Sequence, residues 1–131
     1  MEKITMRIEA EINPTETEPK VREAIEKMFG PMDTKIKTQG KVSLIQADTS
    51  DQDALTRFHN LLQREHIRAA ARTVLLKGMD RKTLSFCLNK QVAYAGHVSF
   101  SQEQSESPLG PIRVEIRSEN PKEIIEYLTH M

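Results

Sequence analysis

The 131 residues of the sequence include one cysteine, Cys87, and no tryptophan. A single thiol cannot form an internal disulfide, so a reducing compartment, the cytoplasm, is the expected setting. Aromatic residues make up only 5% of the chain, so surfaces on which nucleic-acid bases could stack must be few. No apolar run approaches the roughly 20 residues that a membrane-spanning helix needs, and the polar–apolar alternation at the start is unlike a signal peptide. These absences predict a soluble protein that does not engage a membrane.

Motifs for catalysis and cofactor binding are also missing. None of the histidines forms a pair spaced as metal ligands, and one cysteine cannot build a thiolate site; the histidines are His59, His66, His97 and His130. The five glycines form neither a Gly-x-Gly loop nor a P-loop. Cys87 stands on an expected strand without a helix N-terminus to activate it, which favours a packed, inert thiol over a nucleophile. The sequence therefore predicts no enzyme, no metal and no cofactor.

Charge is balanced overall but uneven along the chain. Nineteen basic and 19 acidic residues give zero net charge, which argues against a protein that coats nucleic acid by bulk attraction. Residues 64–82 hold six basic and two acidic side chains, a net charge of +4 that leaves −4 on the rest. The basic six are Arg64, Arg68, Arg72, Lys77, Arg81 and Lys82. Such a region indicates either a local binding surface or a face that is merely solvated.

Strands are predicted where apolar residues recur at every second position. The expected strands cover residues 4–12, 35–37, 42–45, 84–88 and 112–116, with a shorter extended piece over 92–100. Gly40 lies in the turn of a hairpin between the second and third of them. Residues 101–107 are polar and acidic, which predicts an exposed loop.

Helices are predicted where apolar residues recur every three or four positions. They are expected over residues 15–28, 51–62, 67–77 and 121–128. Thr15 and Glu18 have the spacing of a capping box, and Thr49, Ser50 and Asp51 are candidate N-caps of the second helix. We expect a break near Glu65 and His66, because one uninterrupted helix of about 28 residues would be long. Helices interspersed with hairpin-joined strands predict one α+β domain over residues 1–131, with an antiparallel or mixed sheet and helices on one face.

The basic region falls largely on the third of these helices. There Arg68 and Arg72 are one turn apart and opposite the apolar side. Guanidinium groups about 6 Å apart match the spacing of successive phosphates on a nucleic-acid strand. Lys77 and the basic residues beyond Gly78 extend this surface, and Lys90 joins it across the edge of the sheet.

Two late segments resemble the signatures of a small archaeal family. Leu-Asn-Lys-Gln-Val-Ala at 88–93, followed by Gly96 and Phe100, is one, and Ser-Pro-Leu-Gly-Pro-Ile at 107–112 is the other. The family is uncharacterised protein family two-hundred-and-one, and the order of elements up to Gly78 resembles it too. The resemblance implies an RNA-binding or exosome-related protein that dimerises. It also implies a fold similar to the large-subunit ribosomal protein that binds the smallest ribosomal RNA. It supplies no catalytic residues.

Both segments can also be interpreted as structural turns without a ligand. Pro108 and Pro111 restrict the chain and Gly110 permits a tight turn, so the second segment is favoured as a turn over a ligand loop. Asn89, Lys90 and Gln91 either contact phosphates and bases or make the turn at the strand end.

The function that these observations favour is non-catalytic binding of structured RNA, read through backbone and shape because aromatic residues are few. The residues expected at the RNA are Arg64, Arg68, Arg72, Lys77, Arg81, Lys82, Lys90 and Gln91. The alternative is a homodimeric interaction module of an RNA-processing or ribosome-related complex, whose contacts would be apolar. An enzyme of unrecognised class ranks last, because no nucleophile–base or metal constellation is found.

Overall fold

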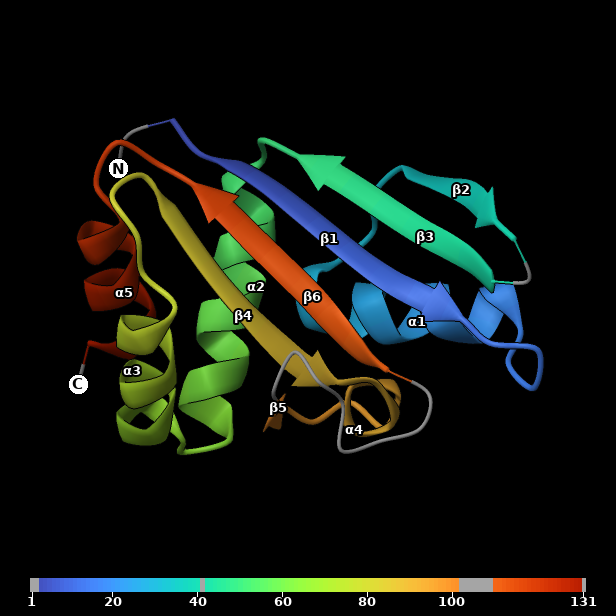
Figure 1. Cartoon of the computed structure of the whole chain (residues 1–131). Coiled ribbons are helices and arrows are strands. Elements are labelled where there is room, and N and C mark those ends of the chain that lie inside the picture. Colours follow the sequence, from blue (N-terminus) through green and yellow to red (C-terminus); the bar gives the residue numbers. More distant parts are fainter. Residues whose placement is uncertain (1–2, 41, 102–109, 131) are drawn as a thin grey trace.

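A six-stranded antiparallel sheet organises the chain in a computed structural model, which describes residues 3–40, 42–101 and 110–130 (Figure 1). The strand order is β2-β3-β1-β6-β4-β5, and every neighbouring pair is antiparallel. The strands are β1 (Thr5–Ile12), β2 (Thr34–Gln39), β3 (Val42–Thr49), β4 (Thr83–Asn89), β5 (Phe100–Ser101) and β6 (Pro111–Arg117). The first and last long strands, β1 and β6, are therefore neighbours in the middle of the sheet.

Helices pack on one face of this sheet, and no helix among the described residues covers the other face (Figure 1). They are α1 (Glu18–Phe29), α2 (Gln52–Arg64), α3 (Arg68–Lys77), α4 (Lys90–Tyr94) and α5 (Pro121–Thr129). Helices α1 and α2 lie behind the sheet, α3 and α5 lie together along its β4 side, and α4 packs against α1. The α+β class and the placement of helices on one face, expected from the sequence, are confirmed.

The core lies between the helices and the sheet. Phe58 of α2 sits at its centre, with ring centroids 5.1 Å from Phe29, 5.4 Å from Phe86 and 6.5 Å from Phe100. On the strands, the inward residues alternate with outward ones as the period-two pattern predicts. In β1, for example, Met6 and the apolar residues two and four positions later are fully buried. The aromatic content of the chain is therefore largely used by the core.

Several local predictions are confirmed. Asp51 caps α2, its side chain accepting a hydrogen bond from the Asp53 amide at 2.9 Å. The expected break between α2 and α3 is present, and His66 adopts a φ of 56° there. Gly40 joins β2 and β3 with a φ of 64°, a conformation that glycine adopts without strain. Helix α3 ends at Gly78 as predicted.

Two predictions are wrong. The residues after Asn89 form the short helix α4 and not an extended piece. The Asn89 side chain accepts a hydrogen bond from the Val92 amide at 3.0 Å and so starts a helical turn. In this part of the described chain only Phe100 and Ser101 form a strand. The capping box at Thr15 does not form, since α1 begins at Glu18 with Thr17 as its N-cap. The expected loop over 101–107 lies almost entirely outside the described residues.

Candidate nucleic-acid interface

The uncovered side of the sheet, called here the open face, is formed by the outward residues of the strands. Strand pairing places Arg113 of β6 between Glu9 of β1 and Cys87 of β4. It places Arg7 of β1 between Glu115 of β6 and Asp48 of β3. Polar and charged side chains from three neighbouring strands therefore meet on one surface.

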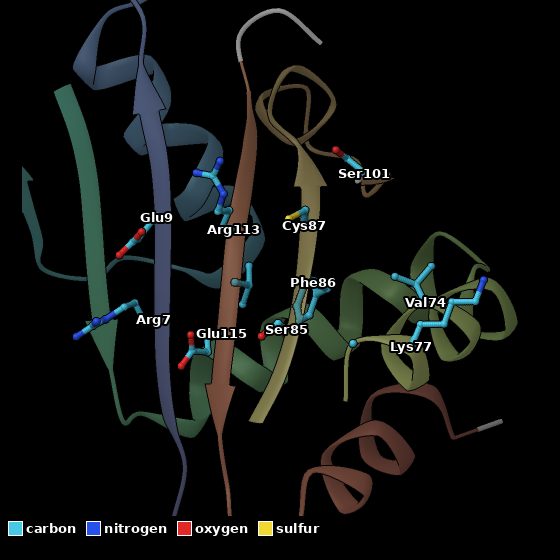
Figure 2. A pocket seen from close by; sticks show the side chains of 12 residues that line it. Arg7, Glu9, Val74, Lys77, Ser85, Phe86, Cys87, Ser101, Arg113 and Glu115 are labelled. Atoms are coloured by element: carbon cyan, nitrogen blue, oxygen red, sulfur yellow. The ribbon is translucent and has the colours of Figure 1, made fainter. Parts of the chain in front are cut away.

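A hollow of about 540 Å³ lies on the open face (Figure 2). Its lining comes from β1, β4, β6, the end of α3 and Ser101 of β5. In Figure 2, Arg113 and Cys87 stand side by side in the middle, and Val74 and Lys77 lie on α3 beyond the edge of β4. The hollow is lined by three cationic and two carboxylate side chains.

Gly78 brings the end of α3 to the hollow. The Ser85 amide donates a hydrogen bond to the Gly78 carbonyl at 2.9 Å. A Cβ atom on Gly78 would lie 1.9 Å from the Ser85 carbonyl oxygen, so only glycine permits this approach. Lys77, the preceding residue, is exposed and is held at the rim of the hollow as a result.

Two arginines of the open face, Arg7 and Arg117, are held by neighbouring carboxylates. Arg7 Nε donates to Asp48 at 2.9 Å, and this hydrogen bond, with the charge of Asp48, raises the pKa of Arg7. Arg117 Nε lies 2.9 Å from a carboxylate oxygen of Glu115. Because a guanidinium carries five N–H donors, Arg7 can keep Asp48 and bind a second anion as well. The carboxylates orient the guanidinium groups without using all their donors.

Arg68 and Arg72, expected to point into solvent, contact α5 instead. Arg68 donates to the His130 carbonyl at 2.8 Å. Arg72 donates to Glu126 at 2.6 Å and to the Thr129 hydroxyl at 3.3 Å. The hydrogen bond to Glu126 raises the pKa of Arg72 and lowers that of the carboxyl group. The expected solvent face is therefore wrong for these two arginines, which are half-buried and connect α3 to α5 and to the residue that follows it.

The other predicted basic residues are scattered. Arg64 donates to the Gly96 carbonyl at 3.3 Å. Lys82 is exposed and pairs with Glu119 at 3.5 Å. Arg81 is exposed and lines a shallow hollow between the α3–β4 and β6–α5 connections. Of the predicted set, Lys77 alone lines the hollow of the open face.

Lys90 is buried, with 2% of its surface exposed. Its ammonium group donates to the Glu11 carbonyl at 2.7 Å and to Glu16 at 2.8 Å. Burial raises the pKa of Glu16, but hydrogen bonds from Lys90 and Asn13 outweigh it, and the net pKa is lowered. Gln91, the next residue, is exposed and lines a separate hollow near α1.

Sequence reasoning missed Arg7 and Arg113 as a pair. The alternation of β1 does predict that Arg7 faces away from the core. Arg113, however, lies more than 100 positions later in the sequence, and only the pairing of β1 with β6 brings the two residues together. Cys87 lies on the expected strand, and it is half-buried on the open face because it alternates with the core residues Phe86 and Leu88. That its thiol is inert stays a prediction.

Neither a metal centre nor a membrane span is found in the described ranges. No group of three or more His, Cys, Asp and Glu side chains within residues 3–40, 42–101 and 110–130 could hold a metal ion. None of the helices described is both long enough and apolar enough to cross a membrane.

The fold and the open face define a two-layer α+β protein that presents a charged antiparallel sheet. A family model described as RNA binding matches residues 5–118. A UPF0201 protein of Sulfurisphaera tokodaii is 38% identical over 122 residues, which is 93% of this chain and 84% of that protein. A UPF0201 protein of Saccharolobus islandicus is 34% identical and covers 95% of this chain and 86% of its own length. This chain belongs to the UPF0201 family.

The fold of a solved relative agrees with this assignment. The crystal structure of a UPF0201 protein from Methanococcus jannaschii superposes with a TM-score of 0.85 at 30% identity, covering 95% of this chain and 98% of that one. The resemblance to uncharacterised protein family two-hundred-and-one, inferred from the two late segments, is thereby confirmed.

Proposed function

We propose that this chain is an RNA-binding protein without catalytic activity, and that the open face contacts the phosphate backbone of structured RNA. The observation that carries the proposal is the convergence of Arg7, Arg113 and Lys77 on one hollow of the sheet. The match to a family model described as RNA binding, over β1 to β6, supports the same function.

Backbone contact fits the chemistry of this surface better than base stacking. Guanidinium and ammonium groups bind phosphate oxygens through charge-assisted hydrogen bonds. Stacking needs exposed aromatic rings, whereas Phe86, the aromatic residue among those that line the open-face hollow, is only 6% exposed. Double-helical RNA is recognised mainly through its phosphates and its shape.

Within this proposal the predicted basic residues have different roles. Lys77 contacts RNA at the rim of the hollow, and the exposed Arg81 and Lys82 extend the surface along the same connection. Arg64, Arg68 and Arg72 join elements of the protein, as their hydrogen bonds to Gly96 and to α5 indicate. Lys90 stabilises the fold, because its ammonium is buried against Glu16.

The experiment is a titration of blunt duplex RNA over a series of salt concentrations, with Arg7→Ala, Lys77→Ala and a Lys35→Ala control. Lys35 is exposed on the edge strand β2 and does not line the hollow. Each lost phosphate contact should weaken binding and reduce the salt slope by about one. Equal losses for Lys35→Ala and Lys77→Ala would show that the open-face hollow is not the contact surface.

The proposal also includes a homodimer. Strand β2 is an edge of the sheet, and its Ile36 is 43% exposed. Exposed edge strands with apolar residues tend to pair with another chain. The same edge would serve the rival function, an assembly module that binds another protein and not RNA. Light scattering should give about twice the 15.0 kDa chain mass; a mass near 15.0 kDa at micromolar concentrations would contradict the dimer.

A further inference from the structure

A second hollow, of about 220 Å³, lies between α1 and α4 at the end of the sheet. Its lining includes Val21 and Ala24 of α1, and Gln91 and Tyr94 of α4. It shares no lining residue with the hollow of the open face. The two hollows therefore differ in place and in chemistry.

The hollow between α1 and α4 combines apolar and polar walls. Val21 and Ala24 are 2% and 1% exposed, so they offer it a floor that belongs to the core. Tyr94 keeps 38% of its surface exposed and supplies an aromatic ring. Gln91 and Lys20 are exposed on the rim, with an amide that can donate and accept and an ammonium that can bind phosphate.

Charged contacts fix the walls in advance. The buried ammonium of Lys90, which also lines this hollow, ties α4 to Glu16 at 2.8 Å and to the end of β1 at 2.7 Å. On the other side, Lys27 lies 4.8 Å from the centroid of the Tyr94 ring and donates to the Tyr94 carbonyl at 2.6 Å. A pocket whose walls are already held in place loses little entropy when it is filled.

We propose that this hollow holds one unstacked RNA base, with Tyr94 stacking on it, Gln91 bonding its edge and Lys20 contacting its phosphate. The assignment rests on the proposed function and deepens it. Proteins read unpaired nucleotides by this combination of aromatic stacking and hydrogen bonds to the base edge. The open face would hold the double-helical part of an RNA, and the α1–α4 hollow a nucleotide that is splayed out of it.

Nucleoside 5′-monophosphates and ribose 5-phosphate are the probes that test the hollow directly. The full-length protein is titrated while NMR signals of Tyr94 are followed. Shifts should occur with at least one monophosphate and not with ribose 5-phosphate, which has no base. Tyr94→Ala should weaken this binding at least about fivefold, the lower end of what a base–aromatic stack contributes. Tyr94→Phe keeps the ring and should bind almost normally.

Tyr127→Phe is the matched control, because Tyr127 is a half-buried tyrosine that stacks on His59 at 4.8 Å, away from this hollow. It should leave monophosphate binding unchanged. The idea is overturned if ribose 5-phosphate shifts Tyr94 as strongly as the monophosphates do, or if no monophosphate shifts it.

A second titration separates this idea from the proposed function. Wild-type protein is titrated with blunt duplex RNA and with the same duplex carrying one bulged nucleotide. Preference for the bulged RNA that Tyr94→Ala abolishes, with blunt-duplex binding intact, supports the pocket. Equal affinity of the wild type for both RNAs overturns the pocket and leaves the open face as an RNA surface. Absence of duplex binding, together with base-dependent monophosphate binding, overturns the open face and leaves the pocket.

Discussion

The ammonium of Lys90 lies 2.8 Å from a carboxylate oxygen of Glu16, and the two side chains are only 3% and 13% exposed. Glu16 precedes α1, whereas Lys90 begins α4. The pair therefore joins the β1–α1 connection to the end of β4, two parts of the chain 74 positions apart.

Replacing Lys90 with methionine should lower the free energy of unfolding by about 3 kcal/mol, the lower end of the range for a broken buried pair, because it leaves the half-buried carboxylate of Glu16 without its cation. The double variant Glu16→Leu, Lys90→Met removes both charges and should recover most of this loss. Urea denaturation followed by circular dichroism measures both. A double variant as unstable as the sum of the single ones would show that the pair is not a coupled unit.

Stability should also fall in acid through Glu16. The pKa of this carboxyl group in the folded protein is below its ordinary value of 4.5. The stability contributed by Glu16 is thus fully present above 4.5 and is lost as the pH falls through the lower, folded-state pKa. Glu16→Gln should be less stable than the wild type at neutral pH, and the difference should shrink in acid. A constant difference across that pH range would contradict the assignment.

Arg72 and Lys77 should give opposite results, although both are basic residues of α3. Arg72→Ala breaks the contact with Glu126 and Thr129 of α5, so it should lower the melting temperature and leave the affinity for duplex RNA unchanged. Lys77→Ala removes an exposed cation at the rim of the open-face hollow, so it should weaken RNA binding and leave melting unchanged. Thermal melts and RNA titrations of both variants test this difference. Weaker RNA binding by Arg72→Ala with an unchanged melting temperature would show that Arg72 contacts RNA.

Gly78→Ala should be destabilising near the upper end of the roughly 1–3 kcal/mol that overpacking costs, since its Cβ atom would lie 1.9 Å from the Ser85 carbonyl oxygen. It should also weaken RNA binding, because relief of the clash moves Lys77. Gly40→Ala is the control. Its φ of 64° adds backbone strain of about 1–2 kcal/mol, but nothing lies within 4 Å of the added atom. Chemical denaturation and RNA titration of the two variants measure both effects. Unchanged RNA binding by Gly78→Ala would show that Gly78 does not position Lys77 for RNA.

Local signals in the sequence predicted most of the fold. Alternation along β1, an N-cap within residues 49–51 and the helix stop at Gly78 each depend on neighbouring residues, and each is confirmed. The errors at Thr15 and after Asn89 arose where several polar residues could begin a helix. Helix α1 begins at Glu18 without a side-chain cap, and α4 begins where the Asn89 side chain accepts a hydrogen bond from the Val92 amide.

The candidate site was less accessible to prediction, because it depends on contacts between distant parts of the chain. The period of α3 placed Arg68 and Arg72 away from the core, but it contained no information that α5 would cover them. The sequence likewise showed that Arg7 faces outward. It did not show that Arg113, more than 100 positions later, would lie on the neighbouring strand.

The pairing of β1 with β6 also has a consequence for biosynthesis. Strand β1 is synthesised before the other strands of the sheet, yet the strand that flanks it on one side is completed only at Arg117. Pairings so far apart in sequence form slowly, because the loop between them must close before any contact offsets its entropy. Chains still being synthesised can form the β1–β3 ladder and the β2–β3 hairpin, but one edge of β1 stays unpaired until β6 arrives. Nascent chains therefore expose an aggregation-prone edge, and Arg7 and Arg113 come together on the open face only after β6 has been synthesised.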